Sequence, residues 1–276
     1  MTTLFYARDP AAVNWMIAAR ERLEAGDPPR GLEHARPPFR SLAKSYAIAR
    51  WPGAEAWNGM PDLGDVSLLV TGTTDVDDRT DWALWAAARA AGVPSACLLD
   101  RGTDVEHRFP PDPAAWPDRV LVPDEAAAAL CRAFGIPAGA LHVCGDLHLE
   151  RLKRRGVDGA RAAALRARWA GPGPVVLFAS ECLAEMRAAG KPIPVDEFDV
   201  LAALIARSTG TVVIRPHPRD TPGKYDAWRR EAGPRVLVSE EGSPAEAILA
   251  ADVVAGITST MLDEAAALGR PVERLP

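Results

Sequence analysis

Short apolar runs rich in β-branched residues alternate along this chain with longer stretches in which alanine, leucine and arginine recur at helical spacing. Such alternation is typical of strand–helix–strand units, in which each helix crosses over a parallel sheet. The strand runs are apolar almost throughout, as strands covered on both faces are. The strands predicted in the first half are Leu4 to Ala7, Val66 to Thr71, Ser95 to Leu99, Val120 to Val122 and Leu141 to Cys144.

Helices are predicted between these strands. They cover Ala11 to Glu24, Thr80 to Ala91 and Glu125 to Phe134, and Gly135 caps the carboxyl end of the last one. The segment from Pro28 to Asp62 is rich in proline and arginine, and within it we expect only a helix near Ser41 to Ala49. Its polarity makes this segment a candidate lid or acceptor loop.

A turn-forming cluster, Gly171-Pro172-Gly173-Pro174, follows a basic, alanine-rich helix predicted from Leu149 to Ala170. The strand–helix alternation then restarts and continues to the end of the sequence. At 276 residues the chain exceeds a typical domain of roughly 100 to 200 residues. We therefore predict two Rossmann-like α/β domains with parallel sheets, residues 1–170 and 171–276, with an interdomain cleft.

The strands and helices predicted for the second domain follow the same criteria. The strands are Val175 to Ala179, Thr211 to Arg215, Val236 to Val238 and Asp252 to Ile257. The helices are Val195 to Ser208, Tyr225 to Glu231, Pro244 to Ala250 and Met261 to Leu268.

Charge and cysteine content narrow the classes of partner. With 32 basic and 37 acidic residues the net charge is -5, which gives no broad positive field for nucleic acid. The four cysteines are widely spaced and form no C-x-x-C pair, so a reducing compartment without disulfide or zinc is expected. The N-terminus lacks the pattern of a signal peptide, and no stretch approaches the ~18 apolar residues of a membrane span. A cytoplasmic protein is expected.

The basic stretch Arg151 to Arg155 has two interpretations. We favour an ordinary solvated helix face. The alternative is peripheral contact with the anionic inner face of a membrane that carries a lipid-linked acceptor.

Ligands of open parallel sheets bind outside the carboxyl ends of the strands. The strand that ends near Arg215 runs into Pro216-His217-Pro218-Arg219-Asp220, where two prolines stiffen the turn and arginines flank a histidine. Such a cationic turn suits a phosphate, because imidazole and guanidinium groups both donate hydrogen bonds to phosphoryl oxygens. The alternative is that the prolines only end the strand and that His217 is a solvated loop residue.

A second candidate site follows the last predicted parallel strand, at Gly256-Ile257-Thr258-Ser259-Thr260. Three hydroxyls and several free backbone N–H groups gather there at a helix N-terminus, which attracts anions. Ordinary capping is the alternative, with Thr260 and Asp263 as a capping box. Glu264 lies one helical turn after Thr260 and could accept from ribose hydroxyls, or it could be an exposed helical glutamate.

Carboxylates in the first half offer further candidates. Asp9 follows the first predicted strand and is expected to face the cleft. Asp75, Asp77 and Asp78 lie in a strand-to-helix loop and could bind a divalent metal, but we prefer plain helix capping for them. No metal site is therefore predicted.

The order and spacing of these motifs resemble those in the donor domain of GT-B glycosyltransferases. The matching segments are Arg215-Pro216-His217-Pro218, Ala251 to Gly256, Ser259-Thr260, Glu264-Ala265 and Gly269 to Val272. The likeness is strongest to bacterial sialyltransferase-like, polysialyltransferase-like and glycerophosphotransferase-like enzymes, which carry an HP motif and a following Ser/Thr motif. In the first half, His142 to Asp146 is similar to a segment that ends the acceptor domain in such enzymes and in UDP-GlcNAc 2-epimerases.

The resemblance implies roles for particular residues. Arg215, His217 and the loop Thr258-Ser259-Thr260 would hold the donor phosphates. Glu264 would contact the ribose, and Ser239 and Glu240 would lie near the base. The donor would be a UDP- or CMP-linked sugar, with no other cofactor. In the reaction, His217 would stabilise the leaving phosphate while Asp9 is our candidate for the base.

Three functions are consistent with this interpretation. The first is a glycosyltransferase of polysaccharide biosynthesis, which transfers a sugar to a glycan or lipid-linked acceptor. The second is an enzyme of the UDP-GlcNAc 2-epimerase type, which needs more carboxylates at the sugar ring. The third is a non-catalytic nucleotide-sugar-binding protein.

Overall fold

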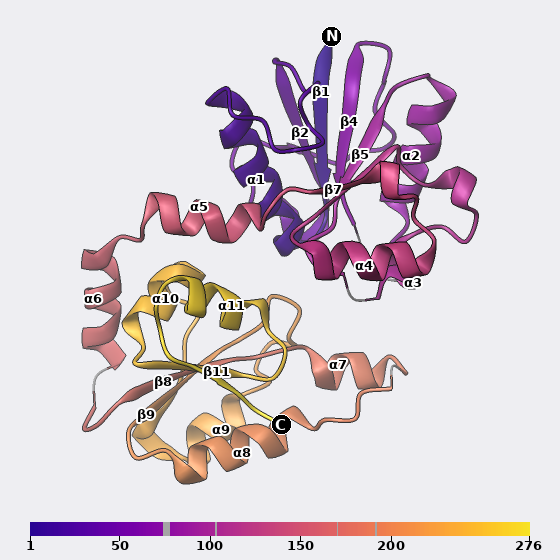
Figure 1. The fold of residues 1–276 in the computed structure, drawn as a ribbon. Coiled ribbons are helices and arrows are strands. Elements are labelled where there is room, and N and C mark those ends of the chain that lie inside the picture. The colour runs from indigo at the N-terminus through magenta and orange to yellow at the C-terminus, as the bar shows by residue number, and fades with distance from the viewer. Residues whose placement is uncertain (74–77, 103, 170, 191) are drawn as a thin grey trace. The chain divides into compact units, whose positions relative to one another are not determined.

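A computed structural model describes residues 1–73, 78–102, 104–169, 171–190 and 192–276. Its contacts divide the chain into two compact units, Met1–Glu150 and Arg151–Pro276 (Figure 1). The division lies earlier than the predicted boundary at residue 170. Helix α6 (Gly159–Trp169) belongs to the second unit, because Leu165 and Trp169 are buried in that unit's core.

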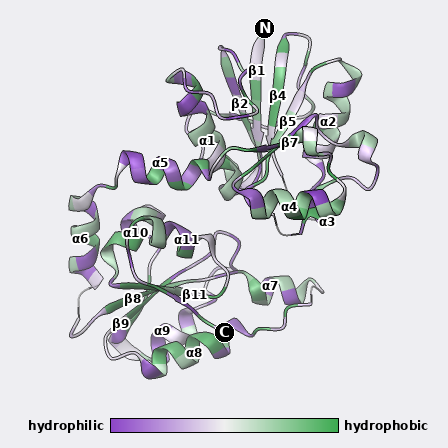
Figure 2. Ribbon diagram, in the orientation of Figure 1, coloured by the Kyte–Doolittle hydropathy of each residue, from purple (hydrophilic) through white to green (hydrophobic). Residues whose placement is uncertain are grey.

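The basic helix predicted from Leu149 to Ala170 is two helices. The first, α5 (Leu147–Arg155), ends before Gly156, which has a φ of 68°. A glycine in the left-handed region commonly ends a helix, because it has no Cβ to clash there. Much of α5 is hydrophilic, in contrast to the hydrophobic strands of the two sheets (Figure 2).

Among the described residues, the first unit holds a seven-stranded sheet in the order β3-β2-β1-β4-β5-β6-β7, and every pair is parallel. The strands are β1 (Thr2–Ala7), β2 (Phe39–Ala43), β3 (Glu55–Ala56), β4 (Val66–Gly72), β5 (Ser95–Leu98), β6 (Arg119–Val122) and β7 (Leu141–Val143). The helices are α1 (Pro10–Glu24), α2 (Thr80–Ala90), α3 (Val105–Arg108) and α4 (Glu125–Phe134). The strand order reverses at β1, between β2 and β4.

The helix predicted near Ser41 to Ala49 is wrong. Phe39–Ala43 forms strand β2, which pairs with β1 from Thr3↔Phe39 to Ala7↔Ala43, and only Ser45–Ala47 makes a 3₁₀ turn. The pairing with β1 satisfies the backbone of this segment, and such tertiary contacts override a weak local preference.

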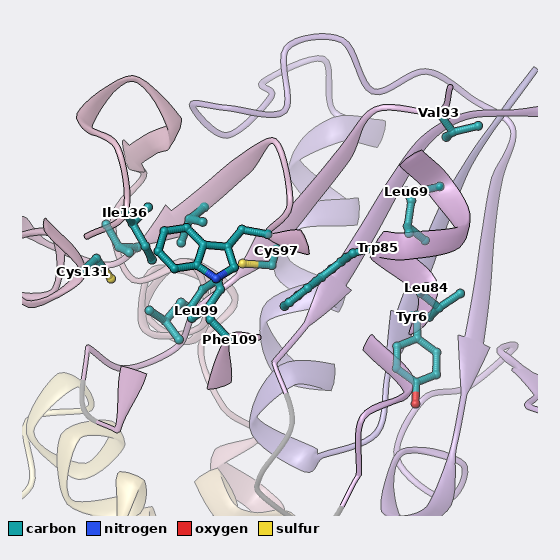
Figure 3. Close-up of a cluster of buried hydrophobic side chains, with 14 of the residues drawn as sticks. Tyr6, Leu69, Leu84, Trp85, Val93, Cys97, Leu99, Phe109, Cys131 and Ile136 are labelled. Carbon is teal, nitrogen blue, oxygen red and sulfur yellow. The ribbon is translucent and has the colours of Figure 1, made fainter. Parts of the chain in front are cut away.

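Helices cover both faces of the first sheet. Along β1, Leu4 and Tyr6 enter one buried cluster, whereas Phe5 and Ala7 enter another. Figure 3 draws part of the first cluster around Trp85 of α2, which stacks on Phe109 and donates from Nε1 to Thr71 Oγ1 at 2.8 Å. The two clusters explain why this unit's strands are apolar almost throughout.

The second unit holds a five-stranded parallel sheet, again among the described residues, in the order β10-β9-β8-β11-β12. Its strands are β8 (Val175–Ala179), β9 (Thr211–Arg215), β10 (Val236–Val238), β11 (Val253–Gly256) and β12 (Val272–Arg274). Helices α6, α10 (Pro244–Ala250) and α11 (Thr260–Ala267) share one buried cluster, and α8 (Glu197–Arg207) and α9 (Asp226–Glu231) share the other. The predicted elements of this unit are confirmed with small shifts at their ends, and α7 (Leu183–Ala188) was not foreseen.

Close contact between β4 and α1 depends on Gly72. A Cβ at this position would lie 2.4 Å from the Ala12 Cβ of α1. We predict that Gly72→Ala lowers the free energy of unfolding by about 1–3 kcal/mol, the usual effect of overpacking. Urea denaturation measures this loss. Gly139→Ala is the control, because no heavy atom lies within 4 Å of its added Cβ. Equal stability of the two variants would contradict the packing described for α1.

Candidate functional site

Three neighbouring strands of the second sheet end at the same edge. Strand β8 lies between β9 and β11, and its register pairs Ala179 with Arg215 and Phe178 with Ala255. Because all three strands are parallel, the loops after them leave from this one edge. The structure thereby places the predicted His-Pro turn and the predicted Ser/Thr loop on either side of the loop that follows β8.

The loop after β11 forms a nest of backbone N–H groups. Consecutive amides of Ile257, Thr258 and Ser259 point toward one carboxylate oxygen, Oε1 of Glu181, at 3.1, 2.7 and 3.0 Å. The hydroxyl of Thr258 donates to the other oxygen, Oε2. Successive amides at a helix N-terminus attract anions. In this protein the anion in the nest is the protein's own carboxylate.

Glu181 is the main site residue that sequence reasoning missed. It follows β8 directly, separated from the strand end only by Ser180, which is buried. The rule that led to His217 and Thr258 is that functional side chains follow strand ends. The same rule, applied to β8, points to Glu181.

The start of α11 differs from the predicted capping box. Ser259 is the N-cap residue, and its Oγ accepts from the Met261 amide at 3.3 Å. Asp263 instead pairs with Arg274, at 2.6 Å. The capping box between Thr260 and Asp263 is therefore wrong, because the helix begins at Thr260 and its N-cap is one residue earlier.

Glu264 lies on α11 and is 6% exposed, so the alternative of an exposed helical glutamate is wrong. Thr258 and Thr260 are exposed, and Ser259 is half-buried. Three hydroxyl side chains thus lie at the start of α11, and the buried carboxylate of Glu264 lies one turn further along the helix. Their role toward a ligand stays a prediction.

The turn after β9 holds His217 in a defined orientation. Its backbone N–H donates to Asp220 Oδ2 at 2.7 Å, and its ring Nδ1 accepts from the Arg219 amide at 3.1 Å. A neutral imidazole that accepts through Nδ1 carries its proton on Nε2, so Nε2–H is a donor. His217 is half-buried in this turn, and its role toward a ligand stays a prediction.

Arg215 braces the loop after β10. Its guanidinium donates to the carbonyl oxygens of Glu241 and Gly242 at 2.6 and 2.7 Å. This loop also carries Ser239, which is 9% exposed, and Glu240, which is exposed. Sequence reasoning assigned Arg215 to phosphate and did not foresee this structural contact.

The ammonium of Lys224 contacts several of the segments that form the site. Its ammonium donates to Asp220 Oδ1 at 2.8 Å, and it pairs with Glu185 and Glu197 at 2.8 and 2.7 Å. It also donates to the Glu181 carbonyl at 3.3 Å. Only 5% of the Lys224 side chain is exposed.

These contacts shift the ionisation of the cluster. Burial lowers the pKa of the Lys224 ammonium, but its hydrogen bonds to three carboxylates outweigh burial and raise the pKa above its ordinary value. Burial raises the pKa of Glu197. Burial also acts to raise the pKa of Glu185, yet hydrogen bonds from Lys224 and the Thr221 amide bring it down to about 2. The cluster therefore holds Lys224 charged.

In the first unit, Asp9 lies at the carboxyl end of β1 as the N-cap residue of α1, and its Oδ1 accepts from the Arg8 guanidinium at 3.1 Å. Arg8 and Lys44 both pair with Asp78 Oδ2, at 3.1 and 2.8 Å. The other oxygen of Asp78 accepts from the Thr80 amide at the start of α2, but the N-cap residue is Arg79, which makes no side-chain capping hydrogen bond. Asp75 and Asp77 lie outside the described residues.

Among the described residues, no group of three or more His, Cys, Asp or Glu side chains is placed to hold a metal ion. In the same part of the chain, no helix has the length and apolar character needed to cross a membrane.

The chain resembles known proteins in its structure. No protein-family model matches the chain, and no curated protein matches it by sequence. The UDP-N-acetylglucosamine 2-epimerase from Rickettsia bellii superimposes with a TM-score of 0.65 and 13% identity, over 99% of this chain and 78% of that one.

Two further solved structures show the same likeness. Anabaena Alr3699/HepE in complex with UDP gives a TM-score of 0.56 and 15% identity, covering 99% of this chain and 80% of that one. The wall teichoic acid polymerase TagF gives a TM-score of 0.58 and 14% identity, covering 98% of this chain and 69% of that one. The GT-B fold predicted from the sequence is confirmed, with two parallel-sheet α/β domains. The sialyltransferase-like part of the resemblance stays a prediction.

The buried ammonium of Lys224 gives a stability prediction. We expect Lys224→Met to lower the free energy of unfolding at pH 7 by about 3–5 kcal/mol, since it leaves buried carboxylates without their cation. Urea denaturation measures this loss. Lys153→Met, on an exposed position of α5, is the matched control and should change stability little. Equal effects of the two substitutions would show that the Lys224 cluster does not hold the loops.

The lowered pKa of Glu185 gives a pH prediction. Its folded pKa of about 2 lies below the ordinary 4.5, so ionised Glu185 stabilises the folded chain above pH 4.5. That stabilisation is lost as the pH falls from 4.5 toward 2. Relative to wild type, Glu185→Gln should therefore be less stable at pH 6, and the gap should close in acid. Thermal unfolding at a series of pH values checks this, and a gap that stays constant would contradict the assignment.

Proposed function

We propose that this chain is a glycosyltransferase that binds a nucleotide-activated sugar through its second unit and transfers the sugar to a glycan or lipid-linked acceptor. The observation that carries the proposal is the amide nest of Ile257, Thr258 and Ser259, which already holds a carboxylate. Groups that bind one oxyanion in this way are suited to another, such as a phosphate. The fold supports the proposal, since HepE of the same fold has been solved with UDP.

In this proposal the second unit receives the leaving nucleotide. The amides of Thr258 and Ser259 and the hydroxyls of Thr258 and Thr260 donate to the phosphate that bears the developing negative charge. The Nε2–H of His217, oriented by the bond at its Nδ1, donates to the same diphosphate. Oriented donors of this kind stabilise a leaving group because they need no reorganisation during the reaction.

The remaining roles extend the same proposal. Glu264 accepts from the ribose hydroxyls, and Ser239 and Glu240 lie near the base of a UDP- or CMP-linked donor. Asp9 of the first unit, held by Arg8, takes the proton from the acceptor hydroxyl. Direct displacement at the sugar carbon then forms the new glycosidic bond and releases the nucleotide.

Epimerisation of a nucleotide sugar is the second candidate, and one observation favours it. Burial raises the pKa of Asp146, which follows β7 in the first unit. A carboxyl group with a raised pKa is suited to exchange protons with a sugar ring. The likeness to UDP-N-acetylglucosamine 2-epimerases fits either reaction at the level of fold.

Calorimetric titration with UDP, CMP, CDP and GDP tests the binding part of the proposal. We expect saturable binding of at least one nucleotide and at least tenfold weaker binding by His217→Ala, because the Nε2–H donor is lost. His107→Ala is the control, since this histidine is exposed on α3 of the first unit. No binding of any nucleotide, or equal binding by both variants, would contradict the proposed site.

Product analysis separates the two reactions. Transfer predicts that a nucleotide sugar releases its nucleotide only when an acceptor glycan is present, whereas epimerisation predicts a C2 epimer without acceptor. Mass spectrometry follows the first product, and proton NMR distinguishes the epimers.

A further inference from the structure

We infer that Glu181 is an internal competitor for the phosphate of the nucleotide. In the ligand-free chain its carboxylate fills the amide nest, and the ligand binds by replacing it. The inference rests on the proposed function, because it assumes that the nest receives a phosphate. It identifies Glu181 as the residue that sets the affinity and the charge preference of that site.

The Glu181 carboxylate occupies all three amides of the nest. Oε1 accepts from all three amides, and Oε2 accepts from the Thr258 hydroxyl. A phosphate oxygen in the nest needs these same N–H groups, which lie along fixed backbone directions. Two anions that share the same donors at contact distance repel each other. Phosphate and the Glu181 carboxylate therefore exclude one another.

The Glu181 carboxylate can leave the nest while the backbone of Glu181 stays in place. The Glu181 carbonyl accepts from Lys224 Nζ at 3.3 Å and from the Leu183 amide at 2.8 Å, which fixes the main chain. Its neighbours Ser180 and Cys182 are buried, but Glu181 is only half-buried. Rotation about the side-chain bonds of Glu181 is therefore enough to open the nest.

The exchange of carboxylate for ligand determines which anions the nest accepts. Without ligand, the Glu181 carboxylate accepts from the three amides and from the Thr258 hydroxyl. With ligand, the incoming group has to outcompete a carboxylate that is tethered and already in place. Weak monoanions such as chloride or free carboxylates do so poorly, whereas the higher charge of a diphosphate favours it. Glu181 thus acts as a filter for multiply charged phosphates.

Calorimetric titration of wild type, Glu181→Ala and Glu181→Gln with UDP, CMP, CDP and GDP tests the inference. We expect Glu181→Ala to bind a nucleotide at least tenfold more tightly than wild type. Glu181→Gln should fall between them, since an amide oxygen still accepts in the nest but carries no charge. Glu231→Ala removes the same charge from the exposed end of α9 and should leave affinity within about twofold.

Thermal unfolding gives an independent readout. Glu181→Ala should melt below wild type in buffer, because its nest is empty, and should gain more from saturating nucleotide than wild type does. If Glu181→Ala does not fold, Glu181→Gln decides, and it must bind more tightly than wild type.

The contradicting outcomes are distinct. If wild type binds and both Glu181 variants bind equally or more weakly, Glu181 organises the site and the inference fails while the proposed function stands. If Glu231→Ala gains as much affinity as Glu181→Ala, the gain comes from the change in net charge and not from the nest, and the inference fails. If no variant binds any nucleotide, even with the nest open, both the inference and the proposed function fail.

Discussion

The ammonium of Lys224 is the interaction on which the candidate site depends. It joins Asp220, on the turn after β9, to Glu185 of α7 and Glu197 of α8, and it also holds the Glu181 carbonyl after β8. The Ser180 hydroxyl donates to the other oxygen of Asp220, Oδ2, at 2.6 Å, and it is also hydrogen-bonded to the Tyr225 hydroxyl. A buried cation among carboxylates is costly to dismantle, because each charge would be left without its partner. The loops that carry His217 and Glu181 are thereby fixed to one another.

The same network separates what is rigid in the site from what can move. The Asp220 carboxylate accepts from the His217 amide, and the Lys224 ammonium donates to the Glu181 carbonyl. Both main-chain segments are held in place by these contacts. The amides of the nest are fixed by the start of α11. The Glu181 side chain is the element whose position rests on hydrogen bonds that a ligand can replace. A rigid set of donors with one exchangeable anion is well suited to bind and release a charged product.

Much of the second unit follows from its sequence, because its strands are short apolar runs and its site motifs follow them directly. The His-Pro turn and the Ser/Thr loop could be found in this way, as could the helix that begins at Thr260. What could not be found are contacts between residues distant in the chain. Glu181 reaches Thr258 across 77 positions, and no local pattern indicates such a bond. No local pattern singles out Lys224 either, because Glu185 and Glu197, two of the carboxylates it pairs with, lie far from it in the chain.

The first unit shows a different limit. Strand β2 lies in a segment rich in proline and arginine, and its identity as a strand comes from pairing with β1, which the sequence around Phe39 does not reveal. The division between the units was also set by packing. Leu165 and Trp169 of α6 are buried against the second core, although a cluster of glycine and proline follows them and resembles a domain boundary.

We expect a phosphate to take the place of the Glu181 carboxylate in the amide nest. A crystal structure of the chain soaked with UDP tests this most directly. The expected result is a phosphate oxygen within hydrogen-bond distance of the Thr258 and Ser259 amides, with the Glu181 carboxylate rotated out of the nest. A nucleotide bound elsewhere, while Glu181 still accepts from those amides, would contradict it.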